Sequence, residues 1–204
     1  MINAIALLTA FSEPRRGAPE DDDALVARHR AGDANAFPAI YRNHVVAVYR
    51  RLTRILGPIA EREDLTQDVF LAVHKLLPAF RGDAKLSTLI HRIAINRAYE
   101  HLRRQSSRPT TLADGWFFDE LVGPAVSPEH HTAAREELAL VFACLARIKP
   151  KKRIAFLLRV VDGLSFTEIG ELVDAAPEAV AKRVQHGQRE LDALLAREQA
   201  RAAP

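Results

Sequence analysis

Basic, amide and imidazole side chains crowd one stretch of the chain, residues 87–104, where only Glu100 is acidic. Such groups donate hydrogen bonds and carry positive charge, which is the chemistry that binds phosphates and base edges. Cations at a helix C-terminus can simply complement the helix dipole, but here they run the whole length and continue to Arg108. The stretch therefore predicts a nucleic-acid surface. Its members are His91, Arg92, Asn96, Arg97, His101, Arg103 and Arg104.

A second polar surface is predicted on residues 164–195, which form two helices joined by a tight turn. Ser165 and Glu168 have the spacing of a capping box, flanked by a hydrophobic staple of Leu164 and Ile169. Pro177 suits the first position of the next helix. The outline is that of a helix-turn-helix, and an ordinary αα-hairpin is the alternative. The outer face carries Glu178, Ala181, Lys182, Gln185, His186 and Arg189, and the inner face Val180, Val184, Gly187, Leu191 and Leu194.

Catalytic patterns are missing from the sequence. It has no HExxH, no glycine-rich phosphate loop and no Cys/His metal spacing. His130 and His131 are adjacent, so on a helix they do not face one another. The single Cys144 lies on an apolar stripe, as a small core residue does, and rules out a disulfide framework, which fits a reducing cytoplasm. We therefore predict no enzyme activity, no metal, no cofactor and no small-molecule substrate.

The spacing of apolar residues predicts an all-α fold. Asp21 to Asp23 cap a short helix that ends near Gly32, and a long amphipathic helix covers 35–56. A third helix covers 60–77, with Leu65, Val69, Ala72, Val73 and Leu76 facing inward. Ser87 is expected to cap a fourth helix, over 87–105, with Ile90, Ile93, Ala94, Ala98 and Leu102 facing inward.

Phe70 and Leu71 fall outside the inward stripe of the third helix and lie beside acidic residues. Two interpretations of Phe70 stay open. It forms an exposed surface that binds a partner, or it packs under a neighbouring loop.

Charge divides the chain into two modules and a connector. Residues 21–109 carry fifteen Lys or Arg and ten Asp or Glu, whereas 110–134 carry no Lys or Arg and four acids. We expect a tail at 1–20, one small helical domain at 21–106 and a flexible acidic linker at 107–132. A four-helix module that includes the helix-turn-helix follows at 133–197, and a tail at 198–204. The sequence contains no apolar run of about 18 residues, so it predicts no membrane span. The first residues lack the features of a signal peptide.

The order of several motifs resembles that of bacterial RNA polymerase sigma factors, in the extracytoplasmic-function (ECF) group of the sigma-70 family. The likeness covers about 22–106 and 133–195. In the first domain it rests on Glu63 to Phe70, on Phe80-Arg81-Gly82 with Leu86-Ser87-Thr88, and on Ile93 to Arg97 with His101 to Arg104. In the second it rests on Pro150, Arg153, Phe156, Leu158-Arg159, Gly163-Leu164-Ser165, Glu168-Ile169-Gly170 and Val180 to Leu191.

The resemblance implies a division of labour between three surfaces. One grips the β′ clamp helices of core RNA polymerase, through Asp64, Leu65, Gln67, Asp68 and Phe70. One opens and reads the minus-ten promoter element, capturing a flipped base in the loop from Phe80 to Ser87. It comprises Phe80, Arg81, Lys85, Ser87, Thr88, His91, Arg92, Asn96, Arg97, His101, Arg103 and Arg104. One reads the minus-thirty-five element, through Ser165, Thr167, Glu178, Ala181, Lys182, Arg183, Gln185, His186 and Arg189.

The resemblance also implies a contact with the β flap of the polymerase, binding to promoter DNA and control by an anti-sigma factor. Two departures from the family pattern stand out. Leu89 occupies a position where the family often has Trp, and the second helix of the helix-turn-helix has few cations. Since a base contact by Arg or Lys is worth about 1–3 kcal/mol, we expect a weaker or differently specified upstream contact. A free-standing helix-turn-helix regulator with a sensing or dimerising N-terminal domain is the competing hypothesis.

Overall fold

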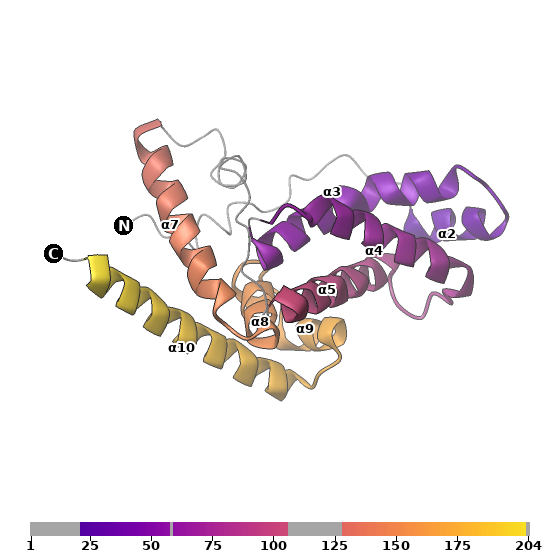
Figure 1. The fold of residues 1–204 in the computed structure, drawn as a ribbon. Coiled ribbons are helices and arrows are strands. Elements are labelled where there is room, and N and C mark those ends of the chain that lie inside the picture. Colours follow the sequence, from indigo (N-terminus) through magenta and orange to yellow (C-terminus); the bar gives the residue numbers. More distant parts are fainter. Residues whose placement is uncertain (1–20, 58, 106–127, 203–204) are drawn as a thin grey trace. The chain divides into compact units, whose positions relative to one another are not determined.

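The computed structural model describes residues 21–57, 59–105 and 128–202. Every regular element in those ranges is helical (Figure 1), so the predicted all-α class is confirmed. The described residues fall into two compact units, one formed by 21–56 and 60–105 and the other containing 128–202. In these ranges no helix combines the length and the apolar composition needed to cross a membrane. The predicted tail at 1–20 and most of the linker lie outside the described residues.

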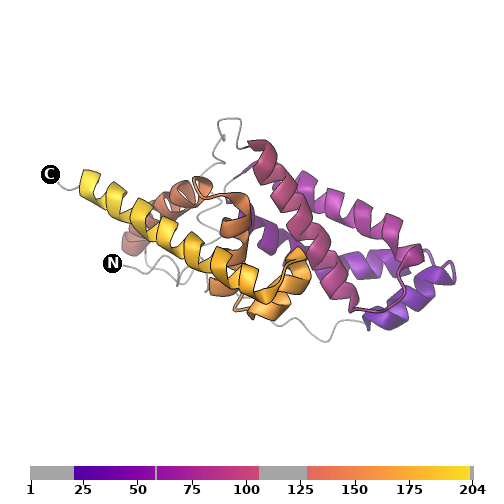
Figure 2. The ribbon, with the colours of Figure 1, turned by 90° about the horizontal axis from the view of Figure 1, so that it is seen from below.

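The first unit is a bundle in which three helices pack against one another and a fourth lies across them (Figure 2). The three are α3 (Ala36–Leu56), α4 (Arg62–Leu76) and α5 (Leu86–Gln105), and the fourth is α2 (Asp22–Arg30). A short 3₁₀ helix, η1 (Leu77–Ala79), follows α4. The core contains Leu25, Ile40, Val48, Leu52, Ile55, Val69, Val73, Leu86, Ile90, Ala94 and Ala98, all buried.

The start of α5 differs from the prediction. The helix begins at Leu86, and the Lys85 carbonyl accepts hydrogen bonds from the N–H groups of Thr88 and Leu89 at 3.0 and 3.2 Å. Ser87 therefore lies inside the first turn, and its prediction as the N-cap is wrong. Burial of Leu86 explains why the helix begins one residue earlier. Its side chain is 1% exposed and packs in the core, so Leu86 belongs to the first turn.

The inward face of α4 and α5 is also set by their neighbours. Leu76, predicted to face inward, is 47% exposed because it lies at the last position of α4, beyond the packed part of the helix. In α5, Ile95 is buried although it falls off the predicted stripe, and Ile93 is only half-buried. A helix packed on two sides buries a wider face than one stripe indicates.

The second unit contains α7 (Pro128–Ala146), α8 (Pro150–Val160), α9 (Phe166–Val173) and α10 (Pro177–Ala202). These are the four helices predicted for this module. α10 packs against α7, α8 and α9. The core is formed by Ala134, Leu138, Val141, Phe142, Cys144, Leu145, Ile148, Phe156, Leu157, Val161 and Leu191.

Two helices of this unit are longer than predicted. α7 begins at Pro128, so the last residues of the predicted linker are helical, and α10 continues to Ala202 through most of the predicted C-terminal tail. Leu194 and Leu195 pack against the core, and Glu198 forms an ion pair with Arg147 at 3.0 Å. These contacts with distant parts of the chain support the additional turns of α10.

Candidate nucleic-acid interface

The start of α9 has the predicted capping box. Ser165 Oγ accepts from the Glu168 N–H at 3.2 Å, and Glu168 Oε2 accepts from the Ser165 N–H at 2.8 Å. The Ser165 hydroxyl, and after it the Ser165 N–H, hydrogen-bond the Glu168 carboxyl and lower its pKa. The box fixes where α9 begins.

The turn between α9 and α10 is tight, as the sequence predicted. Asp174 adopts a left-handed conformation, with φ of 49°, at the end of α9. The Gly170 carbonyl accepts from the Ala175 N–H at 3.0 Å, which folds the turn back on the helix. A Cβ at Gly170 would lie 2.5 Å from the Ala175 carbonyl oxygen. Only glycine at position 170 admits this turn.

Gly187 gives α10 its close contact with α8. A Cβ here would lie 3.1 Å from the Lys152 carbonyl oxygen and 3.2 Å from Phe156 Cβ. Gly187, predicted on the inner face of this helix, is buried and permits the close packing of α10 against α8. The packing turns the opposite face of α10 outward.

That opposite face is largely accessible. Glu178, Lys182, Gln185, His186 and Arg189 are exposed, while Ala181 and Arg183 are half-buried. In α9, Thr167 is exposed, but Ser165 is already engaged in the capping box. One neighbouring contact was not predicted. The Arg159 guanidinium lies over the Phe166 ring, 5.0 Å from its centroid, and donates to the Leu164 carbonyl at 2.9 Å.

The predicted basic surface in the first unit lies on α5. Arg92, Asn96, Arg103 and Arg104 are exposed there. Glu100 forms ion pairs with Arg97 at 3.0 Å and with Arg104 at 3.8 Å. Because one acid is shared between two cations, the face keeps a net positive charge.

The two histidines of α5 are less accessible than its arginines. Burial lowers the pKa of His91 to about 3, and Arg51, His44 and Arg54 add to the effect. Burial also lowers the pKa of His101. The negative charge of Glu61 opposes this lowering, and the positive charge of Arg104 adds to it. His91 therefore adds no positive charge to the surface at neutral pH.

The lowered pKa of His91 makes stability depend on pH. As pH falls below about 6.5, the ordinary histidine pKa, the unfolded chain takes up a proton at position 91 and the folded chain does not, so stability falls toward pH 3. We expect His91→Gln to flatten this loss between pH 6 and 4, measured by urea unfolding. The same change at the exposed His186 is the control. If both variants keep the wild-type slope, His91 is not the titrating group.

The loop before α5 completes this surface. Arg81 and Lys85 are exposed, and Phe80, Ser87 and Thr88 are half-buried. Gly82, with φ of 87°, lets the chain turn between them. The structure thus brings the predicted loop residues to the N-terminal end of the helix that carries the arginines.

The acidic face of α4 is only partly as predicted. Asp64, Gln67 and Asp68 are exposed and Leu65 is half-buried. Phe70 is 3% exposed, and its ring packs edge-on against Tyr41 with the centroids 4.6 Å apart. The interpretation of Phe70 as an exposed partner-binding residue is wrong, because α3 covers that side of α4. Leu71 is the apolar side chain that remains accessible, at 60%.

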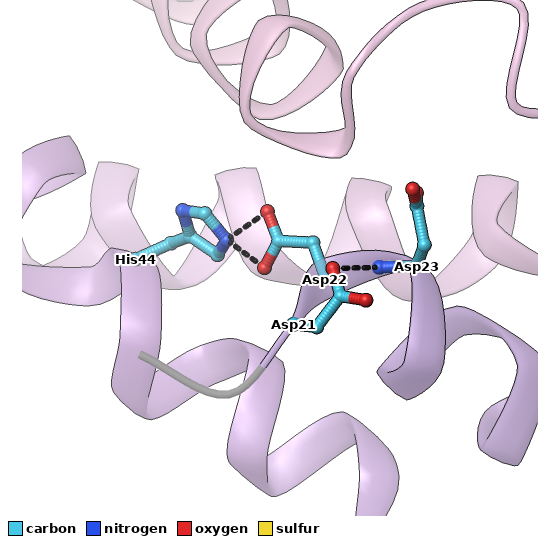
Figure 3. Close-up of polar contacts among 4 residues, drawn as sticks. All are labelled: Asp21, Asp22, Asp23 and His44. Atoms are coloured by element: carbon cyan, nitrogen blue, oxygen red, sulfur yellow. Dashed lines mark hydrogen bonds and ion pairs between the residues drawn. The ribbon is translucent and has the colours of Figure 1, made fainter. Parts of the chain in front are cut away.

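A polar pair that the sequence did not indicate joins α2 to α3. The His44 Nε2–H donates to both carboxylate oxygens of Asp22, at 2.9 and 3.1 Å (Figure 3). Asp21 caps α2 by accepting from the Asp23 N–H at 3.3 Å. Asp22 and His44 are 22 positions apart, so no local pattern relates them. Among the described residues, no group of three or more His, Cys, Asp or Glu is arranged to hold a metal.

Two family models match the chain. Sigma-70 region 2 matches residues 40–108, and sigma-70 region 4 matches residues 138–191. Among curated relatives, the RNA polymerase sigma-H factor of Pseudomonas aeruginosa is 29% identical over 182 residues, covering 86% of this chain and 94% of the relative. The ECF RNA polymerase sigma-E factor of Escherichia coli K12 is 28% identical over 180 residues, covering 84% and 92%.

Solved structures have the same fold. CnrH, determined in complex with the cytosolic domain of CnrY, matches with a TM-score of 0.59 at 24% identity and covers 86% of this chain and 97% of its own. The sigma factor RpoE of Bartonella quintana, determined with the anti-sigma factor NepR, matches with a TM-score of 0.58 at 18% identity. That match covers 78% of this chain and 96% of RpoE.

Proposed function

This chain is an RNA polymerase sigma factor of the sigma-70 family, in its ECF group, and we propose how its surfaces divide promoter recognition. The observation that supports the proposal most directly is the exposed basic face of α5, with Arg92, Asn96 and Arg103. It lies next to a loop with two further cations, Arg81 and Lys85. Exposed cations along one helix attract a phosphate backbone. The unwound non-template strand of the minus-ten element runs along this face.

The helix-turn-helix of α9 and α10 binds the minus-thirty-five element. Lys182, Gln185 and Arg189 are exposed on the outer face of α10, where they reach base edges and phosphates of a duplex. Because only a few cations lie there, this contact contributes less affinity than the minus-ten contact. It positions the chain on the promoter upstream of the site of strand opening.

The exposed face of α4 binds the β′ clamp helices of core polymerase. Asp64, Gln67 and Asp68 supply the polar contacts. Leu71 supplies the apolar contact that the sequence had assigned to Phe70. The second unit binds the β flap. The chain acts by binding, without a catalytic step of its own, and works in the cytoplasm with the polymerase.

The solved relatives suggest a further partner. The structure of CnrH was determined in complex with the cytosolic domain of CnrY, and that of RpoE with the anti-sigma factor NepR. By this likeness in fold, an anti-sigma factor that covers the polymerase-binding surfaces would keep this chain inactive. A free-standing regulator is not favoured, because such a protein needs no sigma-70 region 2 and no acidic face beside a basic one.

Two substitutions separate the proposed surfaces. We expect Arg92→Ala to lower promoter opening by the holoenzyme at least fivefold, since one nucleic-acid contact is worth about 1–3 kcal/mol, while core binding is unchanged. Asp68→Lys is expected to lower affinity for core polymerase at least tenfold, because it reverses a charge in that interface. Run-off transcription and competition for core enzyme measure the two effects.

Arg201→Ala is the matched control, since it removes an exposed guanidinium at the end of α10, outside both surfaces. If Arg92→Ala and Asp68→Lys weaken core binding equally, the division of labour is wrong. If the wild-type chain supports no run-off transcript with core polymerase on any promoter from a random library, the proposed function itself fails.

A further inference from the structure

One acidic side chain lies among the cations of α5. Glu100 is the single Asp or Glu of this helix. Its Oε2 accepts a hydrogen bond from Arg97 Nη1 at 3.0 Å and lies 3.8 Å from Arg104 Nη2. The three residues share one side of the helix, because positions three and four apart are neighbours. One carboxylate therefore holds two of the cations assigned to the minus-ten surface.

The two ion pairs are accessible to solvent. The side chain of Arg97 is 39% exposed, that of Glu100 44% and that of Arg104 79%. Exposed pairs of this kind contribute little to stability. α5 is held in the bundle by its buried residues, which are Leu86, Ile90, Ala94, Ile95, Ala98 and Leu102. The helix therefore does not depend on Glu100 to fold, and a nucleic-acid strand can reach both guanidinium groups.

Arg97 and Arg104 can exchange this carboxylate for phosphates, since a guanidinium group binds both anions through parallel N–H donors. Two turns of helix, about 10 Å, separate the two positions, so each can reach a different phosphate. Arg97 gains from the exchange. Its Nε is buried and has no hydrogen-bond partner in the part of the chain that the structure describes, and such an unpaired donor is costly. Glu100 is thus an internal competitor of the strand.

This competition acts differently on correct and incorrect strands. A strand held only by its backbone meets arginines that are already paired, and the Glu100 carboxylate repels its phosphates. A promoter strand is also held by its bases and by the polymerase, so it presents its phosphates to the arginines at a high effective concentration. Two phosphates then displace one carboxylate. Because specificity is a difference between two affinities, Glu100 raises it by weakening the incorrect complex more.

We propose that Glu100 is a specificity-determining residue, which keeps Arg97 and Arg104 from binding nucleic acid of arbitrary sequence. The inference rests on the proposed minus-ten role of α5 and goes beyond it, since Glu100 itself contacts neither base nor phosphate. It acts through the two arginines, as a positioning residue. The free chain accordingly binds single strands of random sequence weakly.

The first test is fluorescence anisotropy of the full chain with a labelled random single strand of about 20 nucleotides. Glu100→Gln is expected to bind this strand on the order of tenfold more tightly than the wild type at about 0.1 M salt. Each added phosphate contact steepens the fall of log K with log salt by about 0.7. We therefore expect the slope to steepen by about 0.7–1.4. Glu100→Asp keeps the charge and is expected to lie nearer the wild type.

Two controls separate this role from a change in net charge. Glu136→Gln removes an exposed negative charge on α7, outside both nucleic-acid surfaces. It is expected to change affinity by less than about twofold, because salt screens a charge away from the bound strand. In a chain that also carries Arg97→Gln and Arg104→Gln, Glu100→Gln is expected to add no more affinity than Glu136→Gln does. Circular dichroism and thermal unfolding confirm that each variant is folded.

The holoenzyme reveals the consequence for specificity. A promoter is first selected from a random library with the wild-type holoenzyme. The affinity for this promoter divided by the affinity for random duplex is then compared between the wild type and Glu100→Gln. The ratio is expected to fall about fivefold in the variant, because binding to random duplex strengthens more than binding to the promoter.

Three results would overturn the inference. Glu100→Gln binds the random strand no more tightly than the wild type, its gain persists without the cations at 97 and 104, or promoter and random affinities rise equally. If the wild-type holoenzyme opens no promoter in the library, it is the proposed function that fails. Since anisotropy with the free chain needs no polymerase, the two failures are distinguishable.

Discussion

Replacing Phe70 with alanine is expected to lower the free energy of unfolding of the first unit by about 3–5 kcal/mol, the usual cost of emptying a buried phenylalanine site. Phe70 is 3% exposed, and its ring contacts Tyr41 across the α3–α4 interface. Urea unfolding of the full chain, followed by circular dichroism, measures the loss. Hydrogen exchange assigns it to the helices of the first unit.

Leu71→Ala is the matched control, on the next residue of the same helix. Leu71 is 60% exposed, so its truncation is expected to change stability by no more than about 0.5 kcal/mol. It is expected instead to weaken binding to core polymerase. If Phe70→Ala unfolds like the wild type and loses only core binding, the packing described for Phe70 is wrong.

Gly170→Ala is expected to destabilise the second unit by about 1–3 kcal/mol and to reduce binding to a minus-thirty-five duplex. The added Cβ would lie 2.5 Å from the Ala175 carbonyl oxygen, which belongs to the backbone of the turn and cannot rotate away. The turn must shift, and such overpacking has a cost of this order. Because α10 starts at Pro177, directly after the turn, its outer face moves with it. Thermal unfolding and fluorescence anisotropy with duplex DNA measure the two effects.

Gly187→Ala provides the comparison within the same unit. Its Cβ would lie 3.1 Å or more from its neighbours, so smaller movements suffice. The substitution also gains about 1 kcal/mol of helix propensity, which offsets part of the strain. We therefore expect a smaller net change than for Gly170→Ala. An equal or larger loss at Gly187 would show that the α8–α10 contact, and not the turn, limits stability.

Local chemistry in the sequence determined much of this protein. Some features depend only on neighbouring residues, as do the Ser165–Glu168 box and Pro177 in the first turn of α10. Gly187 acts through the absence of a side chain. All three lie where the sequence placed them. The order of the motifs was enough to indicate the family. The charge of the α5 surface also follows from the sequence, because arginine side chains are mostly exposed, as Arg92, Arg103 and Arg104 are here.

Tertiary structure decided which of two available faces each helix buries. Helical periodicity reports one apolar stripe, but α4 packs against both α3 and α5, so Phe70 is covered and Leu71 is left accessible. Packing in the same bundle also makes Leu86, and not Ser87, the first residue of α5. It buries His91 and so lowers its pKa. The Asp22–His44 pair arises only when α2 and α3 meet, because residues so far apart in sequence interact only after the chain has folded.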